Sequence, residues 1–308
     1  MGKKLKLVTH NGSFHTDDVF AAAALSLWLE KKGEDFEIIR SRDEEVIKGA
    51  DYVFDVGGIY DESKNRFDHH QPGGAGKRPA LRSLGEGEEN GIEYSSFGLI
   101  WKKIGEDLVG DREAVDIIDS RLVAPIDAHD NGIDLVEKKH VISPYLIQDF
   151  FRAMCPTWRE DKLNVDDMFL KSVEIAKQIL SREIIHAKDV ALASKSIREI
   201  YDKSEDKRIL IFDKNYTSSE ALAELPEVMF AVYPRSSDNY WGMKATRDNY
   251  KSFKNRKDLP KEWSGLRGEE LQKVTGVEDA VFCHRALFMA VAESKEGAIK
   301  LAELALSR

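Results

Sequence analysis

The segment that decides the fold is LKLVTHNGSFHTDDVFAAAALSLWLEKKG, residues 5–33, because three different patterns follow one another in it. A short β-rich apolar run at 5–10 leads into a polar loop, and an alanine-rich segment at 17–33 comes next. Two aspartates at the start of that segment and Gly33 at its end are typical of the two ends of a helix. The segment therefore predicts a strand, a loop and a helix in succession.

Two more strand patterns follow, at 36–41 and at 51–58. Strands that alternate with helices predict an α/β fold with a parallel sheet. In open sheets of this kind, sites form at the carboxyl ends of the strands. His10 and Asp55 both stand at such predicted ends, and we expect their side chains to converge on one cleft.

The rest of the N-terminal half is expected to be mostly helical. A glycine-rich, charged loop at 71–91 has no periodicity, and a loop of this length is typically functional or disordered. A helix is expected at 94–108, and a second helical pattern at 112–136 is interrupted at Pro125. The stretch from about 140 to 205 has apolar residues at three-to-four spacing, which predicts helix.

After residue 205 the helical pattern of apolar residues gives way to strand patterns, and a second domain is expected there. Strand patterns occur at 207–212, 228–235 and 240–246, and the segment 282–306 ends in a helical pattern. We therefore expect a parallel-sheet domain at 1–200 and a smaller C-terminal α/β domain at 201–308.

Composition limits the class of protein. The chain has 308 residues, 42% of them hydrophobic and 33% charged, which is typical of a globular protein. No apolar run approaches the roughly 20 residues that span a bilayer, so no membrane partner is expected. Two cysteines, Cys155 and Cys283, cannot build a disulfide framework, which favours a cytoplasmic location. The formal net charge of −9 argues against binding nucleic acid over the whole surface, although metal ions can supply local positive charge.

Side chains that can bind metal ions form four clusters, each at a predicted strand end or turn. The clusters are His10, His15 and Asp17; Asp55; Asp68, His69 and His70; and Asp127 with Asp130. Each residue taken alone has an ordinary explanation as a cap or a turn residue. Together they suit a pair of divalent ions, which hold the attacking and leaving oxygens of a phosphoryl displacement and need several carboxylates to offset their charge. Asp55 is the candidate bridge between the two ions.

The ligand types also bear on the metal. Imidazole nitrogens shift the preference away from Mg²⁺ and Ca²⁺ toward Mn²⁺, Zn²⁺, iron or cobalt, and a carboxylate-rich mixed set suits Mn²⁺ best. We therefore expect two Mn²⁺ ions, with Mg²⁺, Zn²⁺ or Co²⁺ as alternatives. A histidine beside a ligand histidine can instead face a substrate phosphate.

Six motifs in order resemble one known family over nearly the whole chain. The order of HNGSFHTD, VFDVGG, DHH and DAHDNG resembles the DHH phosphoesterase superfamily, which includes RecJ-type exonucleases, oligoribonucleases and manganese pyrophosphatases. Within it, the chain resembles the melanocyte-proliferating-gene family, also called metal-dependent protein hydrolases. The motifs that carry this closer resemblance are HNGSFHTDD, RFDHHQ, SSFGLIW, DAHDNGI, WSGLRGEELQKVTG and DAVFCHRALFMA.

The resemblance implies a role for each residue of the four clusters. His10 and Asp17 match the first motif, and His15 stands where the superfamily has an aspartate, with a spacing one residue longer. Asp55 resembles the bridging ligand. His69 resembles the ligand of the third motif, with Asp68 as its supporting partner and His70 facing the substrate. Asp127 and Asp130 both fit the fourth motif, and Asp130 is more similar to its Asp-Thr-Gly pattern.

The resemblance also implies that the C-terminal domain binds substrate. His284, which is expected at the start of a helix beside Arg285, is similar to the histidine that such domains bring to the substrate. Cationic side chains could contact phosphate, and Trp241 or Trp263 could stack on a base, although tryptophan in a strand is more often a core residue. The cations are Arg235, Lys244, Arg267 and Arg285.

Three functions follow from these observations. The first is a metal-dependent phosphodiesterase, a 3′–5′ exonuclease on RNA or short oligonucleotides, since family members of this type are implicated in that activity. The second is a pyrophosphatase or small-nucleotide phosphatase, which the net negative charge of the chain favours. The third is a metal-binding regulatory protein without turnover, which only the substitution at His15 supports. A homodimer remains open in each case.

Overall fold

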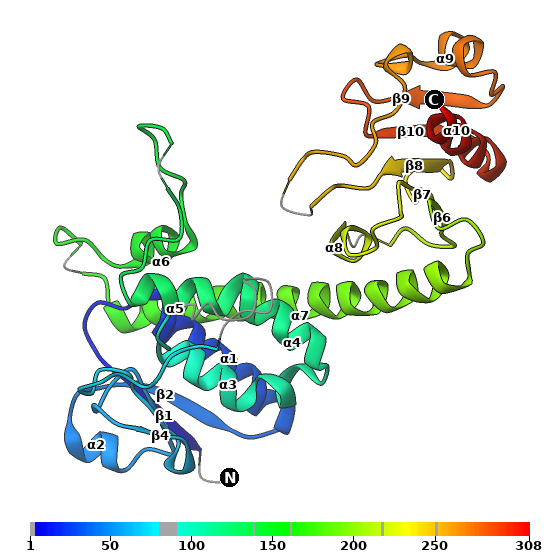
Figure 1. Ribbon diagram of the computed structural model, residues 1–308. Helices are drawn as coiled ribbons and strands as arrows, with labels where there is room; N and C mark the ends of the chain where they lie inside the picture. The colour runs from blue at the N-terminus through cyan, green and yellow to red at the C-terminus, as the bar shows by residue number, and fades with distance from the viewer. Residues whose placement is uncertain (1–3, 80–90, 138, 161, 217–218, 250–251) are drawn as a thin grey trace. The chain divides into compact units, whose positions relative to one another are not determined.

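The computed structural model describes residues 4–79, 91–137, 139–160, 162–216, 219–249 and 252–308 (Figure 1). It divides the chain into two compact units, Met1–Lys188 and Asp189–Arg308. The boundary lies inside the long helix α7 (Val165–Lys203), whereas the sequence placed it at residue 200. Among the described residues, none of the helices combines the length and the apolar character needed to span a bilayer.

A five-stranded sheet forms the base of the N-terminal unit. Its strand order is β2 (Phe36–Arg40), β1 (Leu5–Thr9), β3 (Tyr52–Phe54), β5 (Arg66–Phe67) and β4 (Tyr60–Asp61). All neighbouring pairs are parallel except β4 and β5. The expected parallel α/β sheet is therefore confirmed. The third strand is shorter than the expected 51–58 because Asp55, Gly57 and Gly58 have positive φ angles, which end the extended conformation.

Helix α1 (Thr16–Lys32) forms the centre of this unit. It packs against α3 (Ser96–Val109), and residues 21–24, four successive alanines, are fully buried. A helix with alanine on every face can approach its neighbours closely on several sides, which suits a central position. The Trp28 indole also donates a hydrogen bond of 2.7 Å to the Asp107 carboxylate of α3. The first helix and the strands around it are thereby held in one core.

The helices that follow are more broken than expected. After the short α2 (Glu44–Lys48), the pattern at 112–136 divides into α4 (Arg112–Ile118), a π-helical turn (Asp119–Val123) and α5 (Ala124–Asp130), with Pro125 in the first turn of α5. The segment from 140 contains only α6 (Ile147–Met154) before α7. Continuous helix there was a wrong expectation, because Pro144 and Pro156 flank α6 and cannot extend it.

The C-terminal unit has its own five-stranded sheet. Its order is β6 (Ile209–Ile211), β7 (Phe230–Pro234), β8 (Trp241–Ala245), β10 (Met289–Ala292) and β9 (Ala280–Cys283), in which only β6 and β7 are parallel. Helices α8 (Ser219–Ala223), α9 (Gly268–Thr275) and α10 (Lys295–Ser307) accompany it, together with the C-terminal part of α7. The smaller C-terminal α/β unit is therefore present as expected, with a largely antiparallel sheet.

Candidate metal centre

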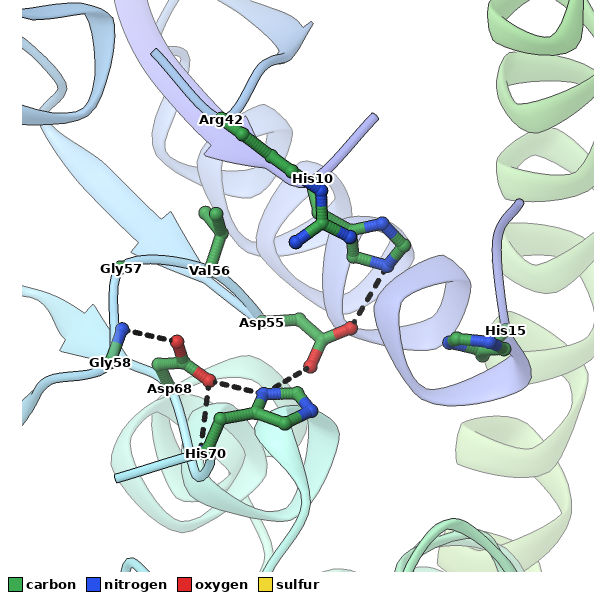
Figure 2. Close-up of a pocket in the computed structure, with 9 residues that line it drawn as sticks. All are labelled: His10, His15, Arg42, Asp55, Val56, Gly57, Gly58, Asp68 and His70. Atoms are coloured by element: carbon green, nitrogen blue, oxygen red, sulfur yellow. Dashed lines mark hydrogen bonds and ion pairs between the residues drawn. The ribbon is translucent and has the colours of Figure 1, made fainter. Parts of the chain in front are cut away.

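The carboxyl ends of three neighbouring parallel strands bring the first residues of the site together. His10 follows β1, Asp55 follows β3, and the triplet that begins at Asp68 follows β5. Because β1, β3 and β5 lie side by side in the sheet, these residues meet although they are far apart in the sequence. Figure 2 shows His10 and His70 directed at the two oxygens of the Asp55 carboxylate. His10 Nε2 lies 3.2 Å from Asp55 Oδ2, and His70 Nδ1 lies 3.6 Å from Asp55 Oδ1.

The backbone at Asp55 has an unusual conformation. Its φ of 54° lies in the left-handed region, which aspartate and asparagine tolerate better than other residues with a side chain. Ser96 at the start of α3 donates a hydrogen bond of 3.3 Å to its carboxylate. Non-glycine residues keep such conformations only where the surrounding fold holds them. Residues of this kind cluster at functional sites.

The first turn of α1 contributes two buried aspartates and the histidine before them. Asp18 Oδ2 lies 3.1 Å from His10 Nε2, and Asp18 Oδ1 accepts a 2.9 Å hydrogen bond from the backbone N–H of His15. Asp17 is 1% exposed, and neither of its oxygens has a hydrogen-bond partner among the described residues. The sequence assigned Asp17 to the site, but it assigned Asp18 only to the helix terminus.

Three overlapping groups of side chains can each hold a cation. They are His10, His15 and Asp55; Asp55, His69 and His70; and Asp17, His69 and Asp130, and within each group the ligand atoms lie within 4.8 Å of one another. Asp55 and His69 are each shared by two groups. The donors are carboxylate oxygens and imidazole nitrogens, a set that suits Mn²⁺ or another first-row divalent ion.

The charges in this pocket fit a bound cation. Burial raises the pKa of Asp17 well above its usual value, and the negative charges of Asp55, Asp130 and Asp18 raise it further. A buried carboxylate without a partner is costly unless a cation neutralises it. The residues present therefore fit a divalent ion, and Asp17 is the residue that most requires one.

Two histidines act as the local cations when no metal is bound. Burial lowers the pKa of His10, but its contacts with Asp18 and Asp55 outweigh burial and raise the pKa to about 10. The same balance, with Asp130 and Asp55 as partners, raises the pKa of His69 to about 10. Burial raises the pKa of Asp55, yet the two histidines hold it below its usual range. Metal binding at neutral pH must therefore displace protons from both imidazoles.

Asp68 positions His70. Its Oδ2 accepts a 2.5 Å hydrogen bond from the Gly58 N–H, and its Oδ1 lies 2.7 Å from His70 Nδ1 (Figure 2). The sequence assigned Asp68 to His69, whereas the described contact is with His70. The His70 side chain is 62% exposed and the His69 side chain only 9%, so His70 is the more accessible to a substrate.

Asp127 lies apart from the three metal groups. It accepts hydrogen bonds from Ser95 Oγ at 2.7 Å and from the Gly98 N–H at 3.1 Å, and it forms a buried ion pair with Arg78. Arg78 also pairs with Asp119. A side chain at Gly98 would clash with the Asp127 carboxylate, so glycine is needed there. Of the two aspartates that the sequence left open, only Asp130 belongs to a metal group.

The pocket over this centre has a volume of about 380 Å³. His10, His15, Asp55, Asp68 and His70 line it together with Arg42, a residue that the sequence analysis did not select. Figure 2 shows Arg42 and His10 among the side chains that line this pocket. Arg42 lies in the loop after β2, whose carboxyl end is next to that of β1, and this position is the only signal that could have identified it.

The residues expected to bind substrate in the C-terminal unit have different environments. Arg235 is hydrogen-bonded to Asp238, Arg267 lies 4.5 Å above the Phe282 ring, and Lys244 lines a separate cavity. Arg285 is exposed. Trp263 is fully buried and is a core residue, and Trp241 is partly exposed.

The sequence suggested that a helix starts at His284, but it does not. It lies in the turn between β9 and β10, and the helix of this region begins at Lys295. Its Nδ1 accepts a hydrogen bond of 3.0 Å from the Ala286 N–H.

Mn²⁺ is expected to stabilise the protein through Asp17. A ligand at 100 times its dissociation constant stabilises the folded state by about 2.7 kcal/mol, or about 5–10 °C in Tm for a unit of this size. Asp17→Asn removes a buried unpaired charge, so we expect a higher Tm than wild type in chelator and a smaller shift with Mn²⁺. Differential scanning fluorimetry measures both, with exposed Asp116→Asn as the matched control. A wild-type Tm that is insensitive to divalent ions contradicts the site.

Comparisons with known proteins confirm the resemblance to this family over nearly the whole chain. The model of a family described as Uncharacterised protein family (UPF0160), under the name MYG1 exonuclease, matches residues 6–306. The MYG1 protein of Dictyostelium discoideum is 30% identical over 97% of this chain and 95% of its own length. The MYG1 exonuclease of Homo sapiens is 27% identical over 98% of this chain and 86% of its own.

Two solved structures are distant matches. A RecJ from Thermus thermophilus in complex with Mn²⁺ has a TM-score of 0.28 and 10% identity, over 98% of this chain and 52% of that one, so this chain spans about half its length. An exonuclease RecJ bound to manganese has a TM-score of 0.26 and 12% identity, over 98% of this chain and 89% of that one. Neither overlap is close enough to support a conclusion about this chain.

Proposed function

The chain belongs to the MYG1 family, UPF0160, and on that premise we propose that it is a metal-dependent hydrolase of the exonuclease type. One observation carries the proposal: three groups of metal-binding side chains overlap at Asp55 and His69, at the carboxyl edge of a parallel sheet. Shared ligands of this kind support a pair of ions rather than a single one. The resemblance to DHH phosphoesterases supports the finer statement, 3′–5′ removal of nucleotides from RNA or short oligonucleotides.

The ligands proposed for two Mn²⁺ ions are His10, His15 and Asp55 for one, and Asp17, Asp55, His69 and Asp130 for the other. Bound divalent ions would supply an activated water and would polarise the phosphodiester. The protein's own side chains then orient the substrate.

His70 is the proposed catalytic side chain outside the metal ligands. The carboxylate of Asp68 accepts a hydrogen bond from Nδ1, which fixes the ring and leaves Nε2 for the substrate. In its protonated form, His70 can donate a hydrogen bond from Nε2 to a phosphate oxygen or give that proton to the leaving oxygen, whereas Nε2 of the neutral ring can only accept a proton. Asp68 is a positioning residue in this arrangement.

The direct test is hydrolysis of a short oligoribonucleotide with and without Mn²⁺. We expect Mn²⁺-dependent release of nucleoside monophosphates from the 3′ end, detected as a series of shortened strands that keep their 5′ label. Pyrophosphate and a dinucleotide, tested in parallel, distinguish the exonuclease from the small-substrate phosphatase that the net charge of −9 favours. Hydrolysis of pyrophosphate alone would overturn the exonuclease proposal.

Arg42 is expected to bind the substrate phosphate. Its side chain is exposed at the pocket, and a charge-assisted hydrogen bond contributes about 1.5–3 kcal/mol, which corresponds to about 10- to 100-fold in rate. Arg42→Ala should lower kcat/KM by this factor and leave the Mn²⁺-induced Tm shift unchanged. Arg112→Ala, which removes an exposed arginine of α4, is the matched control. Equal kcat/KM for the two variants would exclude this role.

A further inference from the structure

One buried arginine holds the loop that carries His15. We call residues 11–15 the His15 loop, which leads from His10 into α1. Arg40, the last residue of β2, donates a hydrogen bond of 2.7 Å from Nη2 to the Gly12 carbonyl of this loop. Its Nη1 donates a second hydrogen bond, also 2.7 Å long, to the carboxylate of Asp166 in the first turn of α7. The guanidinium therefore links the loop to a helix that is distant in the sequence.

Two aromatic rings enclose the Arg40 side chain, which is only 2% exposed. The guanidinium carbon lies 5.7 Å from the ring centre of Phe14 in the loop and 4.6 Å from that of Phe169 in α7. The two rings pack edge to face with their centres 5.6 Å apart, and both are buried. The Cys155 thiol adds a contact of 3.5 Å with the Phe14 carbonyl. The loop is thus fixed through its backbone at Gly12 and through its side chain at Phe14.

Stability alone is a poor explanation for an arginine at this position. The Nε atom of Arg40 has no hydrogen-bond partner among the described residues, although the side chain is buried. Its carboxylate partner, Asp166, is 55% exposed, so water weakens the ion pair. An apolar side chain of similar length could fill the space between the rings without the cost of removing a charge from water. Only a forked donor, however, can hold the Gly12 carbonyl and Asp166 at the same time.

His15 depends on the backbone of its loop for its position. The residue is exposed, whereas His10 and Asp55, the other members of its metal group, are buried. Its ring centre lies 5.6 Å from that of His10. Gly12 has a φ of 92°, a conformation in which a glycine leaves the chain wide freedom. The hydrogen bond from Arg40 removes that freedom.

We propose that Arg40 is a positioning residue of the metal centre. By joining the Gly12 carbonyl to Asp166, it holds His15 at the distance from its partners that a shared cation requires. The proposal rests on the metal binding in the proposed function and not on the choice of substrate. It concerns the ion that His15 binds, because the ligands of the second ion lie outside the loop.

Arg40→Met is the main test, because methionine keeps the apolar contacts with the two rings and removes both hydrogen bonds. The full chain is titrated with Mn²⁺ by calorimetry, at a temperature well below the unfolding transition of each variant. We expect the affinity for the ion at His15 to fall about tenfold, a loss typical of groups that support metal ligands. The second ion should bind as in wild type.

Arg66→Met is the matched control. Arg66 belongs to β5 of the same sheet and also donates hydrogen bonds to backbone carbonyls, those of Lys64 and Ala50. The control therefore removes an arginine with similar bonds away from the His15 loop. It should leave both Mn²⁺ affinities unchanged.

Asp166→Ala tests the attachment to α7 and keeps Arg40 in place, so it remains informative if Arg40→Met does not fold. Loss of a partly exposed ion pair should weaken binding of the same ion by up to about fivefold. Asp167→Ala, at the neighbouring exposed acid, is the control, since both changes remove a favourable charge from the start of the helix. Equal Mn²⁺ affinities of the two variants would overturn the link through α7.

A double-mutant cycle with His15→Ala shows whether Arg40 acts through His15. If it does, Arg40→Met should cause no further loss of Mn²⁺ affinity in the His15→Ala background. Additive losses would overturn the positioning role. A lower Tm of Arg40→Met with unchanged Mn²⁺ affinity would overturn it as well, since this is the result expected of a purely structural arginine.

Failure of this proposal is distinguishable from failure of the proposed function. Oligonucleotide hydrolysis by the wild type, together with unchanged Mn²⁺ affinity in Arg40→Met, refutes the positioning role alone. Weakened Mn²⁺ binding in Arg40→Met, in a protein that hydrolyses no oligonucleotide, supports the positioning role and refutes the exonuclease.

Discussion

Asp55→Asn is expected to lower kcat for oligonucleotide hydrolysis by about a thousandfold, because Asp55 is the proposed ligand shared by both ions. Metal ions stabilise the transition state of phosphoryl transfer by several kcal/mol, and each 1.36 kcal/mol changes the rate tenfold. Loss of one carboxylate oxygen that holds them should remove most of this stabilisation.

The choice of asparagine follows from the backbone at this position. The φ of 54° is tolerated by asparagine but costs alanine about 1–2 kcal/mol. Asp55→Asn leaves His10 and His69 without the carboxylate that they share, so we expect it to lower the Tm in chelator as well as the activity. Asp55→Ala should lower the Tm further, because alanine adds the cost of the left-handed backbone. Asp55→Asn measures the loss of the metal ligand, and the difference between the two variants measures the backbone strain at this position.

Activity is measured at saturating Mn²⁺, and calorimetry with Mn²⁺ follows the metal affinity. Asp61→Asn is a suitable control, because Asp61 belongs to β4 of the same sheet and pairs with Lys64 outside the site. Asp55→Asn with more than a tenth of wild-type kcat would refute the centre as proposed.

Much of the N-terminal unit could be predicted because its signals are local. Periodicity and helix-terminal residues within one short segment predict the strand at 5–10 and the helix after it. They also place His10 and Asp55 at strand ends. β4 and β5 were not predicted, because strands of two residues carry no period. The DHH triplet nevertheless pointed to the candidate site, because its residue types are typical of metal ligands whatever the length of the strand before them.

Other features depend on contacts that the sequence cannot reveal. Arg78 and Asp127 are 49 residues apart, and their pairing follows only from the packing of α3 and α5. The hairpin around His284 was mistaken for a helix start because short apolar runs do not distinguish helix from strand. Leu287, with a φ of 57°, lies in that turn and breaks a helical path.

Asp127 and Asp130 stand three residues apart at the end of α5. We expect Asp127→Asn mainly to lower the Tm and Asp130→Asn mainly to weaken Mn²⁺ binding. Asp127 is 0% exposed, and Asp127→Asn breaks its ion pair with Arg78. Removing one partner of a buried pair costs about 3–5 kcal/mol, which is about 10 °C in Tm for a unit of this size. Asp130 pairs with His69 at 3.1 Å and belongs to a metal group.

Thermal unfolding in chelator, followed by titration with Mn²⁺, distinguishes the two residues. Asp127→Asn should lower the Tm in chelator by about 10 °C, and whatever folded protein remains should still respond to Mn²⁺. Asp130→Asn should lower the Tm in chelator by less than Asp127→Asn does, because His69 keeps its contact with Asp55. It should weaken Mn²⁺ binding by about 10- to 100-fold, a loss comparable to that seen when partners of metal ligands are removed. Gly98→Ala supplies an independent check, because its added methyl group displaces the Asp127 carboxylate without changing any charge. It should reproduce the Asp127→Asn pattern. If Asp127→Asn instead keeps its Tm and loses Mn²⁺ binding, Asp127 is the ligand of the fourth motif and Asp130 is not.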